Sequence, residues 1–213
     1  MRAVKAIADR LLAGVALVAF SPVLAAIAVW IWVDDGRPAL IAQERAGKYG
    51  IPFRMLKFRT MVRDAIEAGK RLGLEDPWGL VPDDPRITRS GRFLRRTSLD
   101  ELPQLLNVLK GEMSLVGPRP YLVDQVANYS ESDRRRLAVR PGITGWSQVH
   151  GREEISWPER FAQDAWYVEH WSLLLDAKIV LATFAQLFRT GEAPLEDTMN
   201  IERARARTHE QSR

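Results

Sequence analysis

A long apolar segment near the N-terminus constrains this chain more than any other feature of its sequence. Residues Leu11 to Val33 carry no charge and are numerous enough to span a bilayer. A basic lead with Lys5 and Arg10 precedes them, as is typical of membrane segments. No small-residue cleavage site separates the segment from the acidic pair at 34–35, which argues against a cleaved signal peptide. The sequence therefore predicts a membrane segment within residues 1–36.

The pair Ser21-Pro22 lies in the middle of this segment and predicts a bend. Proline removes one helical hydrogen bond, and its ring clashes with the preceding turn. Each half would measure roughly 16 Å, short of a hydrocarbon core of about 30 Å. Two geometries remain open: a kinked helix that spans the bilayer, and a re-entrant helix-break-helix that returns to the same side. Basic residues on both flanks favour the re-entrant form, because cytoplasmic flanks are the basic ones.

Residues 37–190 are predicted to form one compact domain, and the middle of the chain gives its first elements. Two short strand-like stretches around a glycine-containing turn, between Gln43 and Met61, predict a β-hairpin. Arg63 to Leu74 has a helical pattern. The stretch from Asp76 to Pro85 is rich in proline and aspartate and predicts a surface loop, as does the glycine-containing stretch from Pro141 to Trp146.

The C-terminal part predicts two helices between Trp157 and Phe188, followed by a polar tail at 191–213 that is expected to be disordered. Tryptophans on the first helix, and Asp176 and Lys178 within the apolar second one, indicate interfacial or core helices rather than membrane spans. The predicted fold class is α+β and mostly helical. It combines the N-terminal membrane helix with a compact domain that has a small hairpin and interfacial amphipathic helices.

Arginines recur at every third position from Arg86 to Arg95, and Arg96 adjoins them. On a helix several of these side chains would share one face, and guanidinium groups match phosphate oxygens bidentately. A solvated or lipid-facing basic helix is the alternative, and it is the simplest interpretation of the run at 134–136. Phosphate binding gains weight for the first run because it leads directly into paired carboxylates.

Those carboxylates belong to Ser98-Leu99-Asp100-Glu101, which fits a helix capping box. Pro103 complicates that interpretation, since a helix that starts at Asp100 accommodates the proline better. In both cases Asp100 and Glu101 lie at the positive end of a helix, which keeps them ionised and close to bound phosphates. An anionic aspartate among arginines is what nucleophilic attack on a phosphoryl group requires.

Further residues bear on the chemistry of the site. The turn Gly117-Pro118-Arg119-Pro120 would fix Arg119 toward the same phosphates, and Gly151-Arg152 supplies a further phosphate ligand. The absence of cysteine and the scattered positions of three histidines disfavour thiolate catalysis and His- or Cys-built metal sites. Any metal would therefore be a hard cation such as Mg²⁺. No Walker-type loop or Gly-x-Gly-x-x-Gly turn is present, which disfavours the usual nucleotide-binding folds.

Seven stretches in one order carry a resemblance to a known family. They are Ser21-Pro22; Gln43-Glu44-Arg45 with Gly47 and Gly50; Lys57-Phe58-Arg59-Thr60-Met61; Ser98-Leu99-Asp100-Glu101-Leu102-Pro103-Gln104; Ser114-Leu115-Val116-Gly117-Pro118-Arg119-Pro120; Arg140-Pro141-Gly142-Ile143-Thr144-Gly145-Trp146; and Gly151-Arg152. Together they cover roughly residues 5 to 190. In these stretches the chain resembles the bacterial sugar transferases, the monotopic phosphoglycosyl transferases that begin membrane glycoconjugate assembly.

The resemblance implies the re-entrant form, with the break at Ser21-Pro22, and a small member of the family made of the catalytic core alone. It implies chemistry at the cytoplasmic face of the bacterial inner membrane, among its lipids. The implied reaction is ping-pong. Asp100 attacks the sugar-bearing phosphorus of a UDP-sugar and UMP leaves, and a polyprenyl (undecaprenyl) phosphate then attacks the aspartyl phosphosugar.

The resemblance also implies roles for individual residues. Mg²⁺ would bridge Asp100 and the diphosphate, while Glu101 would orient the metal or act as the base for the incoming lipid phosphate. These two acids are the predicted catalytic and metal-binding residues. The predicted phosphate-binding and supporting residues are Lys57, Arg59, Arg95, Arg119, Arg152 and Asp176.

Two other classes of function compete with this hypothesis. The basic balance and the arginine run would suit a membrane-anchored nucleic-acid-binding protein, but base-stacking aromatics are not interleaved with the basic residues, so no nucleic-acid partner is expected. A non-catalytic scaffold that binds lipid through its basic face is the third hypothesis. The identity of the sugar, the glycan pathway and the presence of a homodimer all stay open at this stage.

Overall fold

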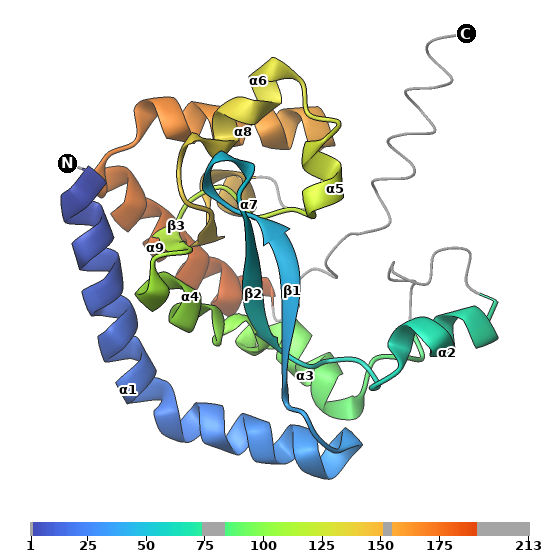
Figure 1. Ribbon diagram of the computed structural model, residues 1–213. Coiled ribbons are helices and arrows are strands. Elements are labelled where there is room, and N and C mark those ends of the chain that lie inside the picture. The colour runs from blue at the N-terminus through green and yellow to red at the C-terminus, as the bar shows by residue number, and fades with distance from the viewer. Residues whose placement is uncertain (1, 74–83, 151–154, 191–213) are drawn as a thin grey trace, which may run out of the picture.

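The computed structural model describes residues 2–73, 84–150 and 155–190, and Figure 1 shows their arrangement. The predicted tail at 191–213, most of the predicted loop at 76–85, and Arg152 lie outside the described residues. The longer elements are α1 (Arg2–Asp35), β1 (Leu40–Ala46), β2 (Pro52–Phe58), α2 (Ala65–Arg71), α3 (Arg89–Thr97), α4 (Gln104–Lys110), α8 (Trp157–His170) and α9 (Leu173–Thr190). The shorter ones are η1 (Lys48–Gly50), η2 (Leu99–Glu101), β3 (Ser114–Val116), α5 (Val123–Val126), α6 (Glu131–Arg134), η3 (Arg135–Ala138), β4 (Gly142–Thr144) and α7 (Trp146–His150).

The N-terminal helix α1 is continuous and bends near its middle, where Pro22 lies (Figure 1). Ser21 Oγ donates a hydrogen bond to Val18 O at 2.8 Å, so this hydroxyl serves the backbone of its own helix. The predicted bend is confirmed, but it lies within an unbroken helix rather than between two separate ones. Large apolar side chains such as Val15 and Val33 are exposed along α1. Among the described helices, α1 is the one that is long and apolar enough to cross a membrane.

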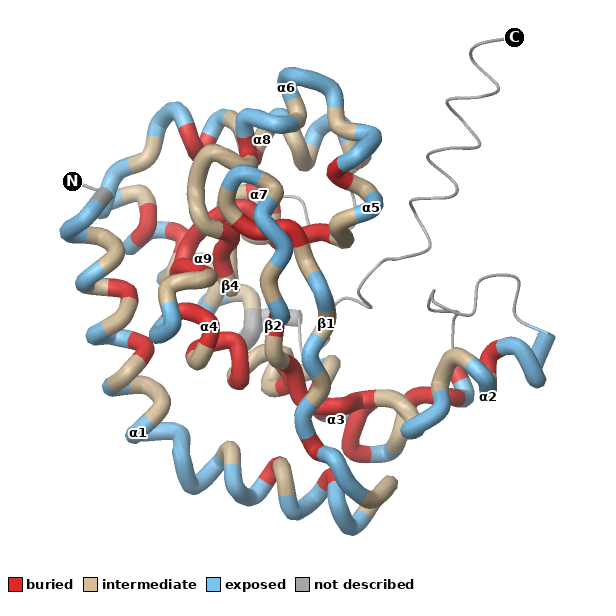
Figure 2. Tube along the Cα trace, in the orientation of Figure 1, coloured by how far each residue is buried: buried red, intermediate tan, exposed pale blue. Residues whose placement is uncertain are grey.

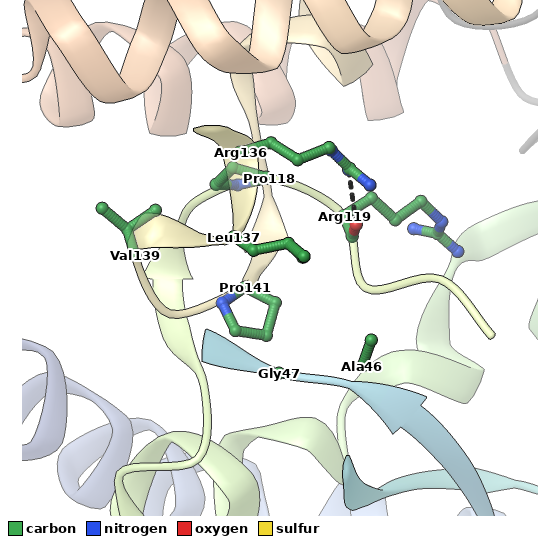
Figure 3. Close-up of a pocket in the computed structure, with 8 residues that line it drawn as sticks. All are labelled: Ala46, Gly47, Pro118, Arg119, Arg136, Leu137, Val139 and Pro141. Atoms are coloured by element: carbon green, nitrogen blue, oxygen red, sulfur yellow. Dashed lines mark hydrogen bonds between the residues drawn. The ribbon is translucent and has the colours of Figure 1, made fainter. Parts of the chain in front are cut away.

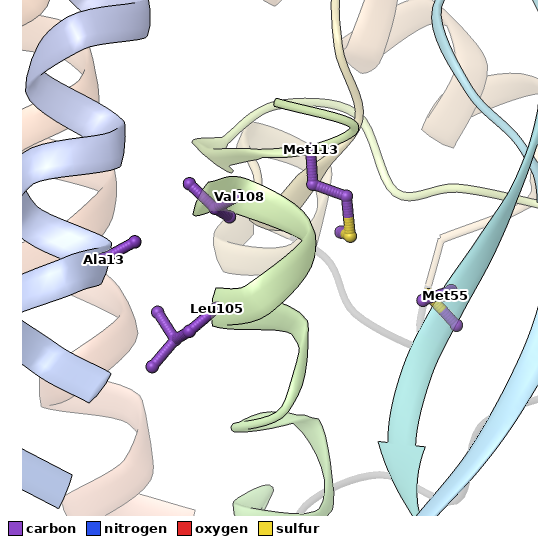
Figure 4. Packing of buried hydrophobic residues seen from close by; sticks show 5 residues of the cluster. All are labelled: Ala13, Met55, Leu105, Val108 and Met113. Atoms are coloured by element: carbon purple, nitrogen blue, oxygen red, sulfur yellow. The ribbon is translucent and has the colours of Figure 1, made fainter. Parts of the chain in front are cut away.

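Both arms of the bent helix pack against the same domain. In the first arm, Ala13 is fully buried in a cluster with Leu105 and Val108 of α4 (Figure 4). In the second arm, Ile31 is buried in a separate cluster that includes Leu94 of α3. Figure 2 shows the exposed outer side of α1 and the buried residues gathered where α4, α9 and β4 meet. The bend therefore lets one helix cover two sides of the domain.

The predicted hairpin is confirmed, although it begins earlier than expected. Strands β1 and β2 pair antiparallel, with Leu40 opposite Phe58 and Ala46 opposite Pro52. The short η1 turn joins them, and Gly50 there has a φ of 76°, a conformation that favours glycine. The helical stretch predicted from Arg63 to Leu74 is also present, as the shorter α2.

A second, parallel pair of strands was not predicted. Residues 141–146 were expected to form only a loop, but β4 pairs with β3 in the register Ser114 to Gly142 and Val116 to Thr144. Glycine makes this approach possible, because a Cβ added to Gly142 would lie 2.1 Å from the backbone nitrogen of Gly117. The two glycine-containing stretches thus pack with their backbones in contact. The Pro118–Pro120 turn comes directly after Gly117, at the end of β3.

The two predicted C-terminal helices are α8 and α9. Helix α8 begins with a true capping box, in which Ser156 Oγ accepts from Glu159 N and the Glu159 carboxylate accepts from Ser156 N. Tyr167 of α8 and Ile179 of α9 are buried in one cluster with Val116 of β3. These helices therefore close the domain behind β3 and β4.

Candidate active site

The predicted capping box at Ser98 is wrong. Ser98 adopts the left-handed conformation (φ 56°, ψ 17°), ends α3, and makes no capping hydrogen bond with its side chain. The chain then enters the 3₁₀ turn η2, which holds Asp100 and Glu101, before α4 begins after Pro103. Proline is tolerated there because the first turn of a helix has no partner for its missing N–H. The local fold is thus a reversal between two helices, and the two acids form its inner side, where both are largely buried.

Glu101 is held by cations from two other segments. Arg119 Nη2 donates to Glu101 Oε1 at 3.0 Å, and Lys57 Nζ of β2 lies 3.3 Å from the same oxygen. Burial alone would raise the pKa of Glu101, but the charges of Arg119 and Lys57 outweigh it and hold the pKa at about 2. Burial also lowers the pKa of Lys57 to about 8, against the opposing effect of Glu101. The hairpin and the Pro-Arg-Pro turn therefore converge on one carboxylate. The prediction that Lys57 and Arg119 bind phosphate stays a prediction.

Asp100 differs from its neighbour Glu101 in its hydrogen bonding. Its side chain makes no hydrogen bond to any residue that the structure describes, although the residue is only 8% exposed. Burial, with help from the charge of Glu101, raises its pKa to about 6, against the opposing charges of Lys57, Arg95 and Arg119. At neutral pH the carboxylate is mostly ionised, and no described hydrogen-bond donor occupies its oxygens.

Two further arginines border the acids with unused hydrogen-bonding capacity. Arg95 donates to Thr60 Oγ1 at 2.8 Å, while its buried Nη1 has no partner among the described residues. Arg45 of β1 donates to Gln43 Oε1 at 3.1 Å, and its buried Nε is also without a described partner. Burial and the nearby Arg119 lower the pKa of Arg45 to about 10. Buried N–H groups of this kind normally find an acceptor, so each of these two arginines has one donor left for a further partner.

Arg45 was missing from the predicted site. Its signal was present in the stretch Gln43-Glu44-Arg45 that carries the family resemblance. Residues 43 and 45 share a face of β1 because side chains alternate along a strand. The sequence did not show which face of the hairpin meets the acids, so the residue was not placed.

The arginine run does not form one phosphate-binding face. Arg86 precedes α3 and is buried in an ion pair with Asp84, with Nη2 and Oδ2 2.7 Å apart. Arg89, Arg92 and Arg96 are exposed. Of this run, only Arg95 acts on the acids. Helix α3 starts at residue 89 and buries Ser90, Gly91 and Leu94 against the domain, and Arg95 lies beside this buried face.

Two predicted residues lie in other clusters. Arg59 forms an ion pair with Asp35 at 2.5 Å and also donates to the backbone oxygens of Asp35 and Gly36, so it fixes the end of α1. Asp176 of α9 accepts hydrogen bonds from Lys5 at 2.6 Å and from Tyr167 at 2.6 Å, and so ties the first arm of α1 to the domain. No contact between either residue and the two acids is found within the described part of the chain.

The run at 134–136 is solvated only in part. Arg134 and Arg135 are exposed, but Arg136 is 2% exposed and donates to Asp164, to Tyr129 Oη and to the backbone oxygen of Arg119. The predicted solvated face is therefore wrong for Arg136, whose partners lie far away in sequence. Figure 3 shows Arg136 beside a small hollow, with its guanidinium directed at the Arg119 carbonyl.

The site fits a hard divalent cation through its two acids. Among the described residues, no group of three His, Cys, Asp or Glu side chains gathers to form a complete metal cage. Mg²⁺, however, is commonly held by one or two carboxylates together with substrate phosphates and water. Asp100, which has no described hydrogen-bond partner, and Glu101, whose Oε1 contacts Arg119 and Lys57, are the carboxylates available for this.

Comparison with known proteins identifies relatives of this chain. The chain is 49% identical over 148 residues to the uncharacterized sugar transferase EpsL of Bacillus subtilis, which covers 70% of this chain and 69% of that protein. It is 41% identical over 188 residues to the exopolysaccharide production protein ExoY of Rhizobium meliloti, covering 82% and 81% of the two chains.

A third relative is larger. The UDP-glucose:undecaprenyl-phosphate glucose-1-phosphate transferase of Xanthomonas campestris pv. campestris is 41% identical over 187 residues, which cover 84% of this chain but 37% of that protein. The family described as bacterial sugar transferase matches residues 1–190. The motifs, the paired acids and these relatives lead to one conclusion: the chain belongs to the bacterial sugar transferase family of enzymes.

Proposed function

We propose that this protein transfers a sugar-1-phosphate from a UDP-sugar to a polyprenyl phosphate, producing a polyprenyl-diphosphate-sugar and UMP. The observation that carries the proposal is the buried carboxylate of Asp100, which has no hydrogen-bond partner among the described residues and lies close to Lys57, Arg95 and Arg119. Two buried guanidinium N–H groups close to the acids, on Arg45 and Arg95, have no described partner. A bound diphosphate would satisfy them. The Xanthomonas relative is named for the same type of donor and acceptor.

In the first step, an Asp100 oxygen attacks the sugar-bearing phosphorus of the UDP-sugar. A carboxylate–phosphorus bond forms, and the bond from that phosphorus to the bridging oxygen breaks, so that UMP leaves with the electron pair. Arg119 and Lys57, which border the acids, offset the charge that develops on the phosphoryl oxygens. The raised pKa of Asp100 makes it a better nucleophile than an exposed aspartate while leaving it mostly ionised at neutral pH.

In the second step, an oxygen of the polyprenyl phosphate attacks the same phosphorus, and the Asp100 carboxylate leaves. The sequence left two roles open for Glu101. A pKa of about 2 makes its carboxylate a weak base, which favours a role in holding charge over a role in accepting a proton. A bound Mg²⁺ would supply neutralisation of the diphosphate charge, with Asp100 and Glu101 as its protein ligands.

The contacts of α1 support the re-entrant geometry. The first arm is tied to the domain by Lys5, which lies 2.6 Å from Asp176. The second arm is tied to it by Asp34, which accepts from Ser90 Oγ at 2.7 Å, and by Asp35, which pairs with Arg59. A helix that crossed the bilayer would separate its two ends by the membrane thickness, so both could not contact one domain on one side. The proposed placement is therefore at the cytoplasmic face of the inner membrane, where nucleotide sugars are available.

The placement of α1 has a direct test because the chain lacks cysteine. Single cysteines at the exposed positions Ala3 and Arg37 would be probed in intact cells and in lysed cells with a membrane-impermeant maleimide. The re-entrant form predicts protection of both positions in intact cells and labelling of both after lysis. Labelling of one position alone in intact cells would indicate a spanning helix.

The reaction has its own test. Purified protein is incubated with Mg²⁺ and each of a panel of UDP-sugars, and UMP is measured with and without polyprenyl phosphate. We expect sustained UMP release only when the acceptor is present, and transfer of radiolabel from a UDP-sugar labelled in the sugar to Asp100 when it is absent. Asp124→Asn, at an exposed acid, is the matched control for Asp100→Asn. Label attached to any other residue would refute the covalent mechanism.

A further inference from the structure

Arg136 is a buried cation that the reaction described above does not use. It lies in η3, and every nitrogen of its guanidinium has a partner. Nε and Nη2 donate to Asp164 Oδ2 at 3.0 Å and 2.5 Å, and Nη1 donates to Tyr129 Oη at 3.0 Å. Asp164 in turn accepts from Ser147 Oγ of α7 at 2.7 Å. The side chain is thus fixed in one orientation, with no rotational freedom left.

Aromatic rings enclose the same guanidinium. Its central carbon lies 4.4 Å from the ring centre of Tyr121 and 4.9 Å from that of Phe161. Tyr129, whose hydroxyl takes one N–H, also presents its ring at 5.9 Å. Arginine suits such a position better than lysine, because a flat guanidinium stacks on rings while its edge still donates hydrogen bonds.

The remaining hydrogen bond connects this cluster to the acids. Arg136 Nη2 donates to the backbone oxygen of Arg119 at 2.7 Å, and the Arg119 side chain extends away from it (Figure 3). That side chain contacts Glu101 at 3.0 Å. Pro118 and Pro120 flank the anchored residue and restrict its backbone further. The position of the Arg119 guanidinium therefore depends on where Arg136 holds the turn.

We infer that Arg136, braced by Asp164 and the aromatic rings, is the positioning residue that aims Arg119 at the two acids of the active site. This inference rests on the proposed function. It assigns a role in catalysis to a side chain that touches neither the acids nor the expected substrates. Arg136 acts through the backbone of Arg119.

The inference predicts an effect that a loss of stability would not produce. The charged groups that face Asp100 are Lys57 from β2, Arg95 from α3, the neighbouring Glu101, and Arg119 from the turn. Of these, Arg119 lowers the pKa of both acids. A displaced Arg119 would lower them less, so the acidic limb of kcat/KM for the UDP-sugar should move to higher pH. Partial unfolding would reduce the amplitude of the profile and leave the limb in place.

The experiment compares Arg136→Lys with Arg135→Lys in the full chain. Arg135 is the adjacent residue of η3 and is exposed, with its partner Glu169 at 3.3 Å. Lysine at 136 keeps the charge but offers one nitrogen where arginine offers three, so it cannot keep the contacts of Nε, Nη1 and Nη2 together. We expect Arg136→Lys to lower kcat by roughly 10-fold or more and to shift the acidic limb upward by about half a pH unit. Arg135→Lys should match the wild type in both.

A double variant tests whether the effect passes through Arg119. In an Arg119→Ala background, adding Arg136→Lys should cause no further shift of the limb, because the group that it displaces is already absent. If Arg136→Lys does not fold, Tyr129→Phe decides the question, because it removes one hydrogen bond and keeps the ring. A smaller upward shift is then expected.

The outcomes separate the two proposals. An inactive wild type would overturn the proposed function itself. An active wild type whose acidic limb stays at the same pH in Arg136→Lys, or in Tyr129→Phe if the former does not fold, would overturn only the positioning role. An equal shift with and without Arg119 would also overturn it, since the effect would then have another route.

Discussion

Two clusters of buried charges lie side by side in this protein and are built differently. The paired cluster consists of Arg136 and Asp164, one cation and one anion, with all three guanidinium nitrogens bonded. The dyad cluster surrounds two acids with more cations than are needed to neutralise them, and some of their N–H groups have no described partner. Its described members are Arg45, Lys57, Arg95, Asp100, Glu101 and Arg119.

The difference teaches what each cluster is for. A balanced and fully hydrogen-bonded pair holds segments in register and gains nothing from another ion. In the dyad cluster, buried N–H groups of Arg45 and Arg95 have no partner among the described residues, so donors are left for an anion, as the proposed function requires. The hydrogen bond from Arg136 to the Arg119 backbone connects the two, so that the first cluster holds the second in place.

The largest expected effect comes from Asp100→Asn, which should separate catalysis from stability. Removal of the proposed nucleophile should reduce UMP release by about 10³-fold or more. The same change should stabilise the fold above pH 6. A raised folded-state pKa contributes stability that is present at low pH and lost as the pH rises through about 6, and the neutral amide avoids that loss. A gain of about 1–3 kcal/mol is expected.

Thermal unfolding at pH 7.5 and at pH 4.5, in detergent without nucleotide, checks the stability part of this prediction. The variant should melt at a higher temperature than the wild type at pH 7.5, and the difference should shrink at pH 4.5. A variant that melts lower at both values would show that the Asp100 charge is compensated by its cations, which would weaken the comparison.

Asp164→Asn should have the opposite effect on stability, because it breaks the paired cluster. The change leaves the buried Arg136 charge without its counter-ion, which costs about 3–5 kcal/mol in comparable buried pairs. Chemical denaturation followed by far-ultraviolet circular dichroism measures the loss. Asp133→Asn, at a half-exposed acid in the neighbouring α6, serves as the comparison and should cost about 1 kcal/mol through its loss of a capping interaction. Equal losses for the two variants would contradict the distinction between the clusters.

Arg45→Gln tests the residue that the sequence did not place in the site. Loss of its charge should lower kcat/KM for the UDP-sugar by roughly 10- to 100-fold, since one charge-assisted contact to phosphate disappears. Arg54→Gln is the matched control, because Arg54 lies on the partner strand of the same hairpin and is exposed. Stability should change little in both. A normal kcat/KM in Arg45→Gln would show that Arg45 does not contribute to binding the UDP-sugar.

Local signals in the sequence predicted much of the fold. Pro22 gave the bend, the glycine-containing turn gave the hairpin, and both C-terminal helices were expected. Each of these depends on residues that are close together in the chain. The parallel strands β3 and β4 were missed because their pairing depends on glycines about 25 residues apart, which have no local pattern.

The site was predictable in its acids and less so in its surroundings. Asp100, Glu101 and Arg119 stood out through motif and charge, and the structure brings them together with Lys57. Arg59 was predicted near the acids but pairs with Asp35, which lies 24 residues away at the end of α1. The sequence predicted the bend in this helix but not the direction in which its second arm runs. Partner choice among many arginines is settled by tertiary packing, which a charge pattern does not encode.

The smallest expected effect is measured through pH and tests the dyad cluster. In a ping-pong reaction, kcat/KM for the UDP-sugar reports the first half-reaction and the free enzyme, so titration of the lipid phosphate does not enter. Asp100 must be ionised to attack, so kcat/KM should be about half-maximal near pH 6 and fall tenfold per unit below it.

Lys57, with a pKa of about 8, should give a second limb on the alkaline side as its charge is lost. Lys57→Arg keeps the charge and should move only that alkaline limb to higher pH. Such a shift would assign the alkaline limb to residue 57.

A bound divalent cation would favour the ionised acid, so the acidic limb should move to lower pH as Mg²⁺ increases. An acidic limb that ignores Mg²⁺ would argue that the cation binds away from Asp100.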